Sequence, residues 1–171
     1  MPLNKNLAKE IMAMVTLDQK ARKDSVKRKG LRSAYKKIDR KNTKELIRII
    51  EKYGWPTISL VGEKASNGAW LIAQHADQEI KFQKRALILL KKNLKDITKS
   101  NIAYLTDRIL INQKKPQLFG TQFTKSKNNL FIPLPIIKAK MVNERRRYYG
   151  MPTIESNVKR INREWKRLGG T

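Results

Sequence analysis

The spacing of apolar side chains predicts a chain built mainly from helices. Residues 1–30 are expected to form a basic amphipathic helix, because apolar positions recur at three- and four-residue steps while Lys and Arg fill the other face. The apolar positions are Leu7, Ile11, Met14 and Val15, and Asp18 continues the same face. A second helix is expected to begin at Asn42, where Asn-Thr-Lys-Glu resembles a capping box, and to end at Gly54. Residues 31–41 would then be a basic connector.

The middle of the chain continues this helical pattern and the following segment departs from it. Further helices are expected over residues 67–78, 79–95 and 100–110, and the first two could be one kinked helix. Alternation then predicts one small β-hairpin near residues 117–133, followed by helices over 139–149 and 154–168. The predicted fold is therefore mainly α, a single-domain helical bundle with one small β-hairpin.

Charge indicates the kind of partner. The chain has 171 residues, no Cys, and 39 Lys and Arg against 14 Asp and Glu, a formal net charge of +25. Such a field attracts polyanions, so RNA or another polyanion is the expected partner and an anionic membrane surface is a second candidate. The alternative is a lysine-rich proteome. No apolar run approaches the ~20 residues of a membrane span, and the first residues lack a secretory pattern, so a cytoplasmic location is expected. The oligomeric state is not indicated.

The only histidine, His75, is a candidate catalytic residue. It is expected near the edge of a buried helical stripe, with the hydrogen-bonding side chains of Gln74 and Asp77 nearby. An imidazole in such a place can act as a general acid or base near neutral pH. The alternative is a core histidine bonded to a backbone carbonyl.

Three later features are also candidates. Arg108, beside Asp107 at the end of a helix, offers a planar fork for a phosphate or carboxylate, or forms an ordinary surface ion pair. Gly120 inside the predicted first strand indicates a bulge or a close approach. Residues 145–147 are three consecutive arginines, of which at least one is expected to point inward or towards a neighbour; with the following tyrosines they also suit nucleic acid. A solvated helix face is the alternative.

Several blocks occur in an order that resembles an uncharacterised bacterial family, catalogued only as a domain of unknown function. The blocks are Gly54-Trp55-Pro56, Gln74-His75-Ala76-Asp77, Phe82-Gln83, Leu105-Thr106-Asp107-Arg108, Gln117-Leu118-Phe119-Gly120-Thr121-Gln122 and a closing Asn143, Arg146 and Gly150. They place a family-like core at residues 40–152, between the N-terminal helix and a basic C-terminal helix at 153–171, all within one domain of residues 1–171. Residues 18–22 also resemble the usual start of the family, and Phe119 stands where Tyr is usual.

The resemblance implies a shared site without supplying an activity. The site residues it implies are Trp55, Gln74, His75, Asp77, Asp107, Arg108, Gln117, Thr121 and Gln122. We assign catalytic roles to His75, Asp107 and Arg108, with Gln74 or Asp107 tuning the imidazole. The remaining residues, together with Arg146, are expected to bind substrate.

The function predicted from these features is a metal-independent hydrolase or transferase that acts on a phosphate-bearing substrate, with RNA as one candidate. No cofactor is expected, and three metal ligands are not evident from the spacing. Thiol catalysis is excluded because the chain has no Cys. The alternative is a non-catalytic module that binds nucleic acid or an acidic partner and whose polar cluster is structural.

Overall fold

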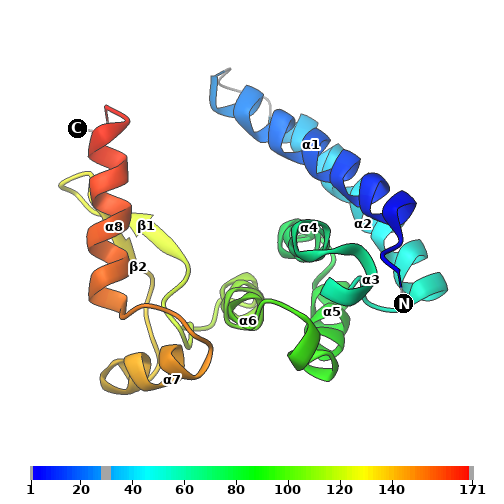
Figure 1. The fold of residues 1–171 in the computed structure, drawn as a ribbon. Coiled ribbons are helices and arrows are strands. Elements are labelled where there is room, and N and C mark those ends of the chain that lie inside the picture. The colour runs from blue at the N-terminus through cyan, green and yellow to red at the C-terminus, as the bar shows by residue number, and fades with distance from the viewer. Residues whose placement is uncertain (1, 28–31, 170–171) are drawn as a thin grey trace. The chain divides into compact units, whose positions relative to one another are not determined.

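The computed structural model describes residues 2–27 and 32–169 and is mainly helical, as predicted (Figure 1). Within these residues there are eight α-helices, two short 3-10 segments and one two-stranded antiparallel hairpin. The chain forms two compact units, residues 1–101 and 102–171. No helix in the described residues is both long enough and apolar enough to cross a bilayer.

The regular secondary structure of the first unit, in the residues that the structure describes, is helical. Its elements are α1 (Lys5–Lys27), α2 (Arg32–Tyr53), α3 (Ile58–Val61), α4 (Glu63–His75), α5 (Ile80–Lys92) and the 3-10 segment η1 (Leu94–Asp96). Helix α1 packs against both α2 and α4, with Ile11 and Leu46 fully buried between them. The approach to α4 is close at Gly68, where an added Cβ would lie 2.9 Å from a methyl carbon of Val15. This close packing brings polar side chains of α1 and α4 within hydrogen-bonding distance.

The predicted start of the second helix is wrong. Helix α2 begins at Arg32 rather than at Asn42, so residues 32–41 are helical and not a connector. Asn42 is buried in the helix interior, and its amide donates to the Met14 carbonyl at 3.2 Å instead of capping a helix end. The stretch after Gly54 contains the short helix α3, and α4 and α5 are separate helices with a turn after His75. Residues 28–30 of the predicted first helix lie outside the described residues.

The second unit contains α6 from Ile102 onward, the hairpin and the last two helices. Its elements are α6 (Ser100–Asn112), β1 (Phe123–Lys125), β2 (Phe131–Pro133), η2 (Ala139–Met141), α7 (Val142–Tyr148) and α8 (Ile154–Arg167). Strands β1 and β2 pair antiparallel, with Phe123 opposite Pro133. The hairpin is shorter than predicted. In residues 117–122, which we call the buried loop, only the two ends pair with the backbone after β2, through an isolated bridge between Gln117 and Ile136 and a bond from the Leu134 amide to the Gln122 carbonyl, while side chains from α6 and α7 hold the middle.

Candidate functional site

His75 is the last residue of α4 and lies in a cluster of charged side chains. We call His75, Asp18 and Arg22 from α1, and Asp39 from α2 the first-unit cluster. The imidazole Nδ1 is 2.9 Å from Asp18 Oδ1, and Arg22 Nε is 3.1 Å from that same oxygen. The other end of the guanidinium donates to Asp39 Oδ1 at 2.6 Å. Three helices therefore contribute to one network around the only imidazole of the chain.

The contact between Asp18 and His75 determines where the imidazole proton lies. An ionised carboxylate can only accept, so Nδ1 must carry the proton that fills the 2.9 Å gap to Asp18. Arg22 Nε, 3.1 Å from Nδ1, then donates to the carboxylate rather than to the ring. While the imidazole is neutral, this arrangement leaves the lone pair on Nε2. The His75 side chain is 16 % exposed and that of Asp18 is 2 % exposed, so solvent reaches part of the imidazole side chain while its carboxylate partner is shielded.

The two carboxylates of the first-unit cluster differ in their electrostatics. Burial acts to raise the pKa of Asp18, but the hydrogen bond from His75 and the charges of His75 and Arg22 outweigh it, so the pKa is below its usual value. For Asp39, burial prevails over the neighbouring Arg22, and the pKa is raised. Asp18 is therefore the carboxylate that stays ionised beside the imidazole.

Asp18, Asp39 and His75 also form a possible set of metal ligands. One ligand atom from each lies within 4.8 Å of the others, and two carboxylates with an imidazole suit a divalent transition metal. In the structure the Arg22 guanidinium bridges the two carboxylates, so it already supplies the positive charge that such an ion would bring. The ring of Tyr35 lies 5.0 Å from the Arg22 guanidinium carbon. A bound ion would have to displace Arg22 from at least one carboxylate.

The other predicted site residues of the first unit lie around α4 and in the core. Gln74 is buried, and the adjacent Gln83 donates through Nε2 to the Gln74 carbonyl at 3.3 Å. Asp77 is in the exposed turn after α4 and accepts a bond from Gln83 at 3.4 Å. Trp55 is only 3 % exposed and belongs to the core of this unit. Gln83, from the predicted Phe82-Gln83 block, thus ties α5 to the segment that carries His75.

In the second unit, Asp107 organises the buried loop. Its carboxylate is fully buried and accepts from the backbone amides of Leu118, Phe119 and Thr121 at 2.8 to 3.2 Å, and from the Thr121 hydroxyl at 2.9 Å. Burial raises the pKa of Asp107, although these hydrogen bonds act in the opposite direction. Both oxygens are occupied by the loop, so the carboxylate fixes backbone conformation in this structure.

Gln117 and Gln122 close the same loop. The buried Gln117 side chain donates to the carbonyls of Gln122 and Leu134 at 2.9 and 2.8 Å and accepts from the Gln122 amide at 2.9 Å. Arg108, half-buried on α6, donates through Nη1 to Gln122 Oε1 at 3.1 Å. Five of the predicted site residues therefore meet here, namely Asp107, Arg108, Gln117, Thr121 and Gln122.

The prediction that one of the three arginines points inward is confirmed by Arg146. Its side chain is 1 % exposed and donates to the carbonyls of Phe119 and Pro152, both at 2.6 Å. Among the described residues its Nη2 has no hydrogen-bond partner. Burial lowers the pKa of Arg146, and the nearby charge of Asp107 partly counters this. The loop is thus held by a buried acid that binds its amides and a buried base that binds a carbonyl.

Gly120 confirms the expected close approach. It has a φ of +68°, and a Cβ placed on it would lie 2.7 Å from Ile154 Cδ1 and 2.9 Å from Ile136 Cδ1. Only glycine fits this position without strain. The close neighbours are side chains from α8 and from the segment after β2, so this glycine serves packing.

The predicted residues therefore form two groups, one in each unit. His75 belongs to the first-unit cluster, whereas Asp107 and Arg108 lie on α6 and bond to the buried loop. A single pocket that combines them stays a prediction. Sequence reasoning missed Asp18, Arg22 and Asp39 as site residues. A signal for Asp18 was present, because it continues the apolar face of α1, where a solvated carboxylate is out of place.

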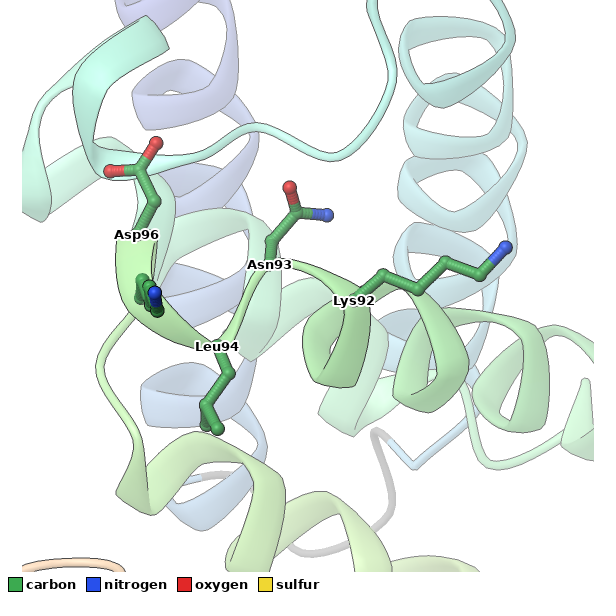
Figure 2. Close-up of a pocket in the computed structure, with 5 residues that line it drawn as sticks. Lys92, Asn93, Leu94 and Asp96 are labelled. Atoms are coloured by element: carbon green, nitrogen blue, oxygen red, sulfur yellow. The ribbon is translucent and has the colours of Figure 1, made fainter.

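A hollow in the first unit has a different lining, and its volume is about 360 Å³ (Figure 2). It is formed by the consecutive residues Lys92, Asn93, Leu94, Lys95 and Asp96. Asp96 points towards α3, where it accepts from the Ser59 amide at 2.9 Å. The predicted site residues are not in this lining, and we assign the hollow no part in the chemistry.

The fold and the two groups define a small, mainly helical protein with an internal carboxylate–imidazole cluster and a separately organised polar loop. Residues 5–166 match the family described as "Family of unknown function (DUF6624)". The match spans nearly the whole chain, so the protein belongs to this family, and the resemblance to a family of unknown function is confirmed. Neither the curated proteins nor the solved structures contain a match.

Proposed function

We propose that the protein is a metal-independent hydrolase or transferase for a phosphate-bearing substrate, with His75 as its general base. The observation that carries the proposal is the 2.9 Å contact between Asp18 Oδ1 and His75 Nδ1. A buried carboxylate that holds one imidazole nitrogen leaves the other in the form that accepts a proton. RNA is the first candidate substrate because of the net charge of +25.

The proposed chemistry uses three groups of the first-unit cluster. His75 Nε2 would take the proton of an attacking water or hydroxyl group, and Asp18 would stabilise the imidazolium that forms. Arg22 keeps Asp18 oriented through its 3.1 Å bond and so acts as a positioning residue. After the new bond forms, the same imidazolium can return its proton to the leaving group.

Exposed cations near the cluster favour an anionic substrate. Two are on α1 and four on α2, namely Lys20, Lys23, Lys36, Lys37, Arg40 and Lys41, and each is within three residues of Arg22 or Asp39 in the sequence. In contrast, the interior of the cluster balances one guanidinium against two carboxylates. A phosphate group would therefore bind at the basic rim, with only the reacting proton passing to His75.

A second candidate function is a non-catalytic binding module. The observation that favours it is that the first-unit cluster links α1, α2 and α4, as a purely structural network would. The two functions predict different behaviour for a variant that keeps the fold. The module needs the network intact but does not need a free imidazole nitrogen.

The test compares wild type with His75→Ala and Asp18→Asn on a panel of nucleotides and short RNAs, with and without EDTA. We expect turnover that resists EDTA, falls about 10²- to 10⁴-fold in His75→Ala, and loses the limb of its pH–rate profile that reports the base. Thermal denaturation of the same proteins separates lost chemistry from lost fold. Equal turnover by wild type and His75→Ala on each active substrate, or no turnover by wild type at all, would reject the enzyme in favour of the module. Activity that requires an added divalent metal would instead assign the imidazole and carboxylates to metal ligation.

A further inference from the structure

A basic groove runs along α8 in the second unit. Its volume is about 410 Å³, and its lining is Leu130, Val158, Lys159, Asn162, Arg163 and Lys166. Five of these residues are on α8, and Leu130 directly precedes β2, which packs beside this helix (Figure 1). The lining thus combines an apolar floor with three cationic side chains and one amide.

The groove is held in shape by contacts between α8 and the hairpin. Asn162 accepts from the Phe131 amide at 2.7 Å and donates to the Phe131 carbonyl at 2.9 Å, so its side chain pairs with the strand as another strand would. The rings of Phe131 and Trp165 meet edge to face at 5.5 Å. Lys125 Nζ lies 3.7 Å from the centre of the indole. A pre-formed surface of this kind binds a ligand without first having to be ordered.

The cations of the groove are available for a ligand. Lys159, Arg163 and Lys166 are exposed and recur at four- and three-residue steps, which places them along one face of α8 at a rise of about 6 Å per four residues. The acidic side chains of this helix are engaged elsewhere: Glu164 pairs with Arg160 at 2.9 Å, and Glu155 accepts from Asn143 at 3.0 Å. Within the described ranges the three groove cations have no ion-pair partner.

The shape and lining of the groove favour one of the three polyanions that such cations attract, namely a membrane surface, a nucleic-acid duplex and a single strand. A membrane would need an apolar face of α8 to insert, but Ile154 and Trp165 already pack inside the unit. A nucleic-acid duplex would offer phosphates but keep its bases away from the floor. A single strand supplies both phosphates for the cations and an unstacked base or sugar for Leu130 and Val158. The volume suits a unit of about one nucleotide.

We infer that this groove binds a single-stranded nucleic acid, with Lys159, Arg163 and Lys166 on the phosphates and Leu130 and Val158 against a base or sugar. The inference does not rest on the chemistry proposed for His75, because a binding groove serves the enzyme and the binding module alike. It assigns the polyanion expected from the net charge of the chain to a defined binding surface.

The experiment measures binding of fluorescein-labelled U12 RNA by fluorescence anisotropy over a range of salt concentrations, with dT12 as a second strand. The variant carries Lys159→Gln, Arg163→Gln and Lys166→Gln. The matched control carries Lys81→Gln, Lys84→Gln and Lys91→Gln on α5, which removes the same number of exposed charges from another helix. Circular dichroism and melting curves show whether each protein keeps its fold, and single Arg163→Gln is a milder variant of the same groove.

We expect the groove variant to lose at least 10-fold in affinity at 0.15 M salt and to reduce the slope of log K against log salt by about 2, since three phosphate contacts to a single strand contribute about 0.7 each. The control should lose less than about 3-fold. Leu130→Asn should weaken binding with an unchanged salt slope, because it alters the floor and no charge. Equal losses in the groove and control variants would overturn the inference. So would a groove-dependent preference for vesicles containing phosphatidylserine over U12.

Discussion

Replacing Asp107 with asparagine tests whether this carboxylate is required for the fold of the buried loop. The amide oxygen of the substituted side chain can keep the bonds from Leu118 and Phe119, but its NH₂ group would face the Thr121 amide, which now donates to Oδ2 at 2.9 Å. Two buried donors would then oppose each other, at a cost of about 1–3 kcal/mol for each unsatisfied group. Relief of the buried charge offsets part of this cost. We expect a loss of about 2–4 kcal/mol in the free energy of unfolding at pH 7.

The assay is urea denaturation followed by circular dichroism, together with hydrogen exchange of the loop amides. Exchange at Thr121 should accelerate more than exchange in α1, because the lost bond is local. Thr121→Val is the matched control: it leaves the carboxylate in place, removes the hydroxyl that donates to Asp107 at 2.9 Å and accepts from Gln122 Nε2 at 3.1 Å, and should cost about 1–2 kcal/mol. If Asp107→Asn unfolds at the same urea concentration as wild type and loses only turnover, then the loop does not depend on the charge and Asp107 serves the chemistry instead.

Three further predictions concern the two groups separately. Gly120→Ala should destabilise the second unit by about 2–4 kcal/mol in a thermal melting experiment, because of its positive φ and the clash of the added Cβ with Ile154. The control is Gly150→Ala, which has φ +66° and no atom within 4 Å of the added Cβ, and it should cost about 1–2 kcal/mol. Arg146→Lys should lower the melting temperature although it keeps the charge, because an ammonium cannot reach two carbonyls in the fork geometry of a guanidinium. The pKa of Asp18 is lowered in the folded protein, so its contribution to stability is complete above the usual value of 3.8 and is lost as the pH falls through the folded pKa. Asp18→Asn should therefore flatten the decline in melting temperature below about pH 4. An unchanged decline would contradict that assignment.

The apolar periodicity predicts most of the helices because it depends on local spacing alone. Helices α1, α6 and α8 begin or end within a few residues of the predicted positions. The start of α2 is wrong because Asn42 is a favourable cap by type, and only the packing of α1 against α2 shows that its amide is needed by the Met14 carbonyl. Tertiary packing here overrides a local signal of about 1 kcal/mol.

In the candidate site, too, local sequence identifies one residue and tertiary packing supplies the others. His75 stands out in the sequence as the only histidine, but its partners Asp18 and Asp39 are 57 and 36 residues away and are brought to it by helix packing. The first strand of the predicted hairpin, expected over residues 117–123, begins only at Phe123 for the same kind of reason. Alternation cannot reveal that Asp107, on another element, takes up the amides that a partner strand would have used.

The two groups of polar residues differ in how far hydrogen bonding within the fold explains them. The blocks around Asp107, Gln117 and Arg146 are accounted for by the hydrogen bonds of the buried loop, with no ligand required. The hydrogen bonds of the first-unit cluster link α1, α2 and α4, but an apolar contact would join these helices without the cost of burying charge. Asp18 and Asp39 lie there with a partly exposed imidazole between helices. A catalytic role for His75 therefore stays a proposal, whereas the hydrogen bonds of Asp107 are those of a residue that holds the loop, although the sequence suggested both as members of one catalytic set.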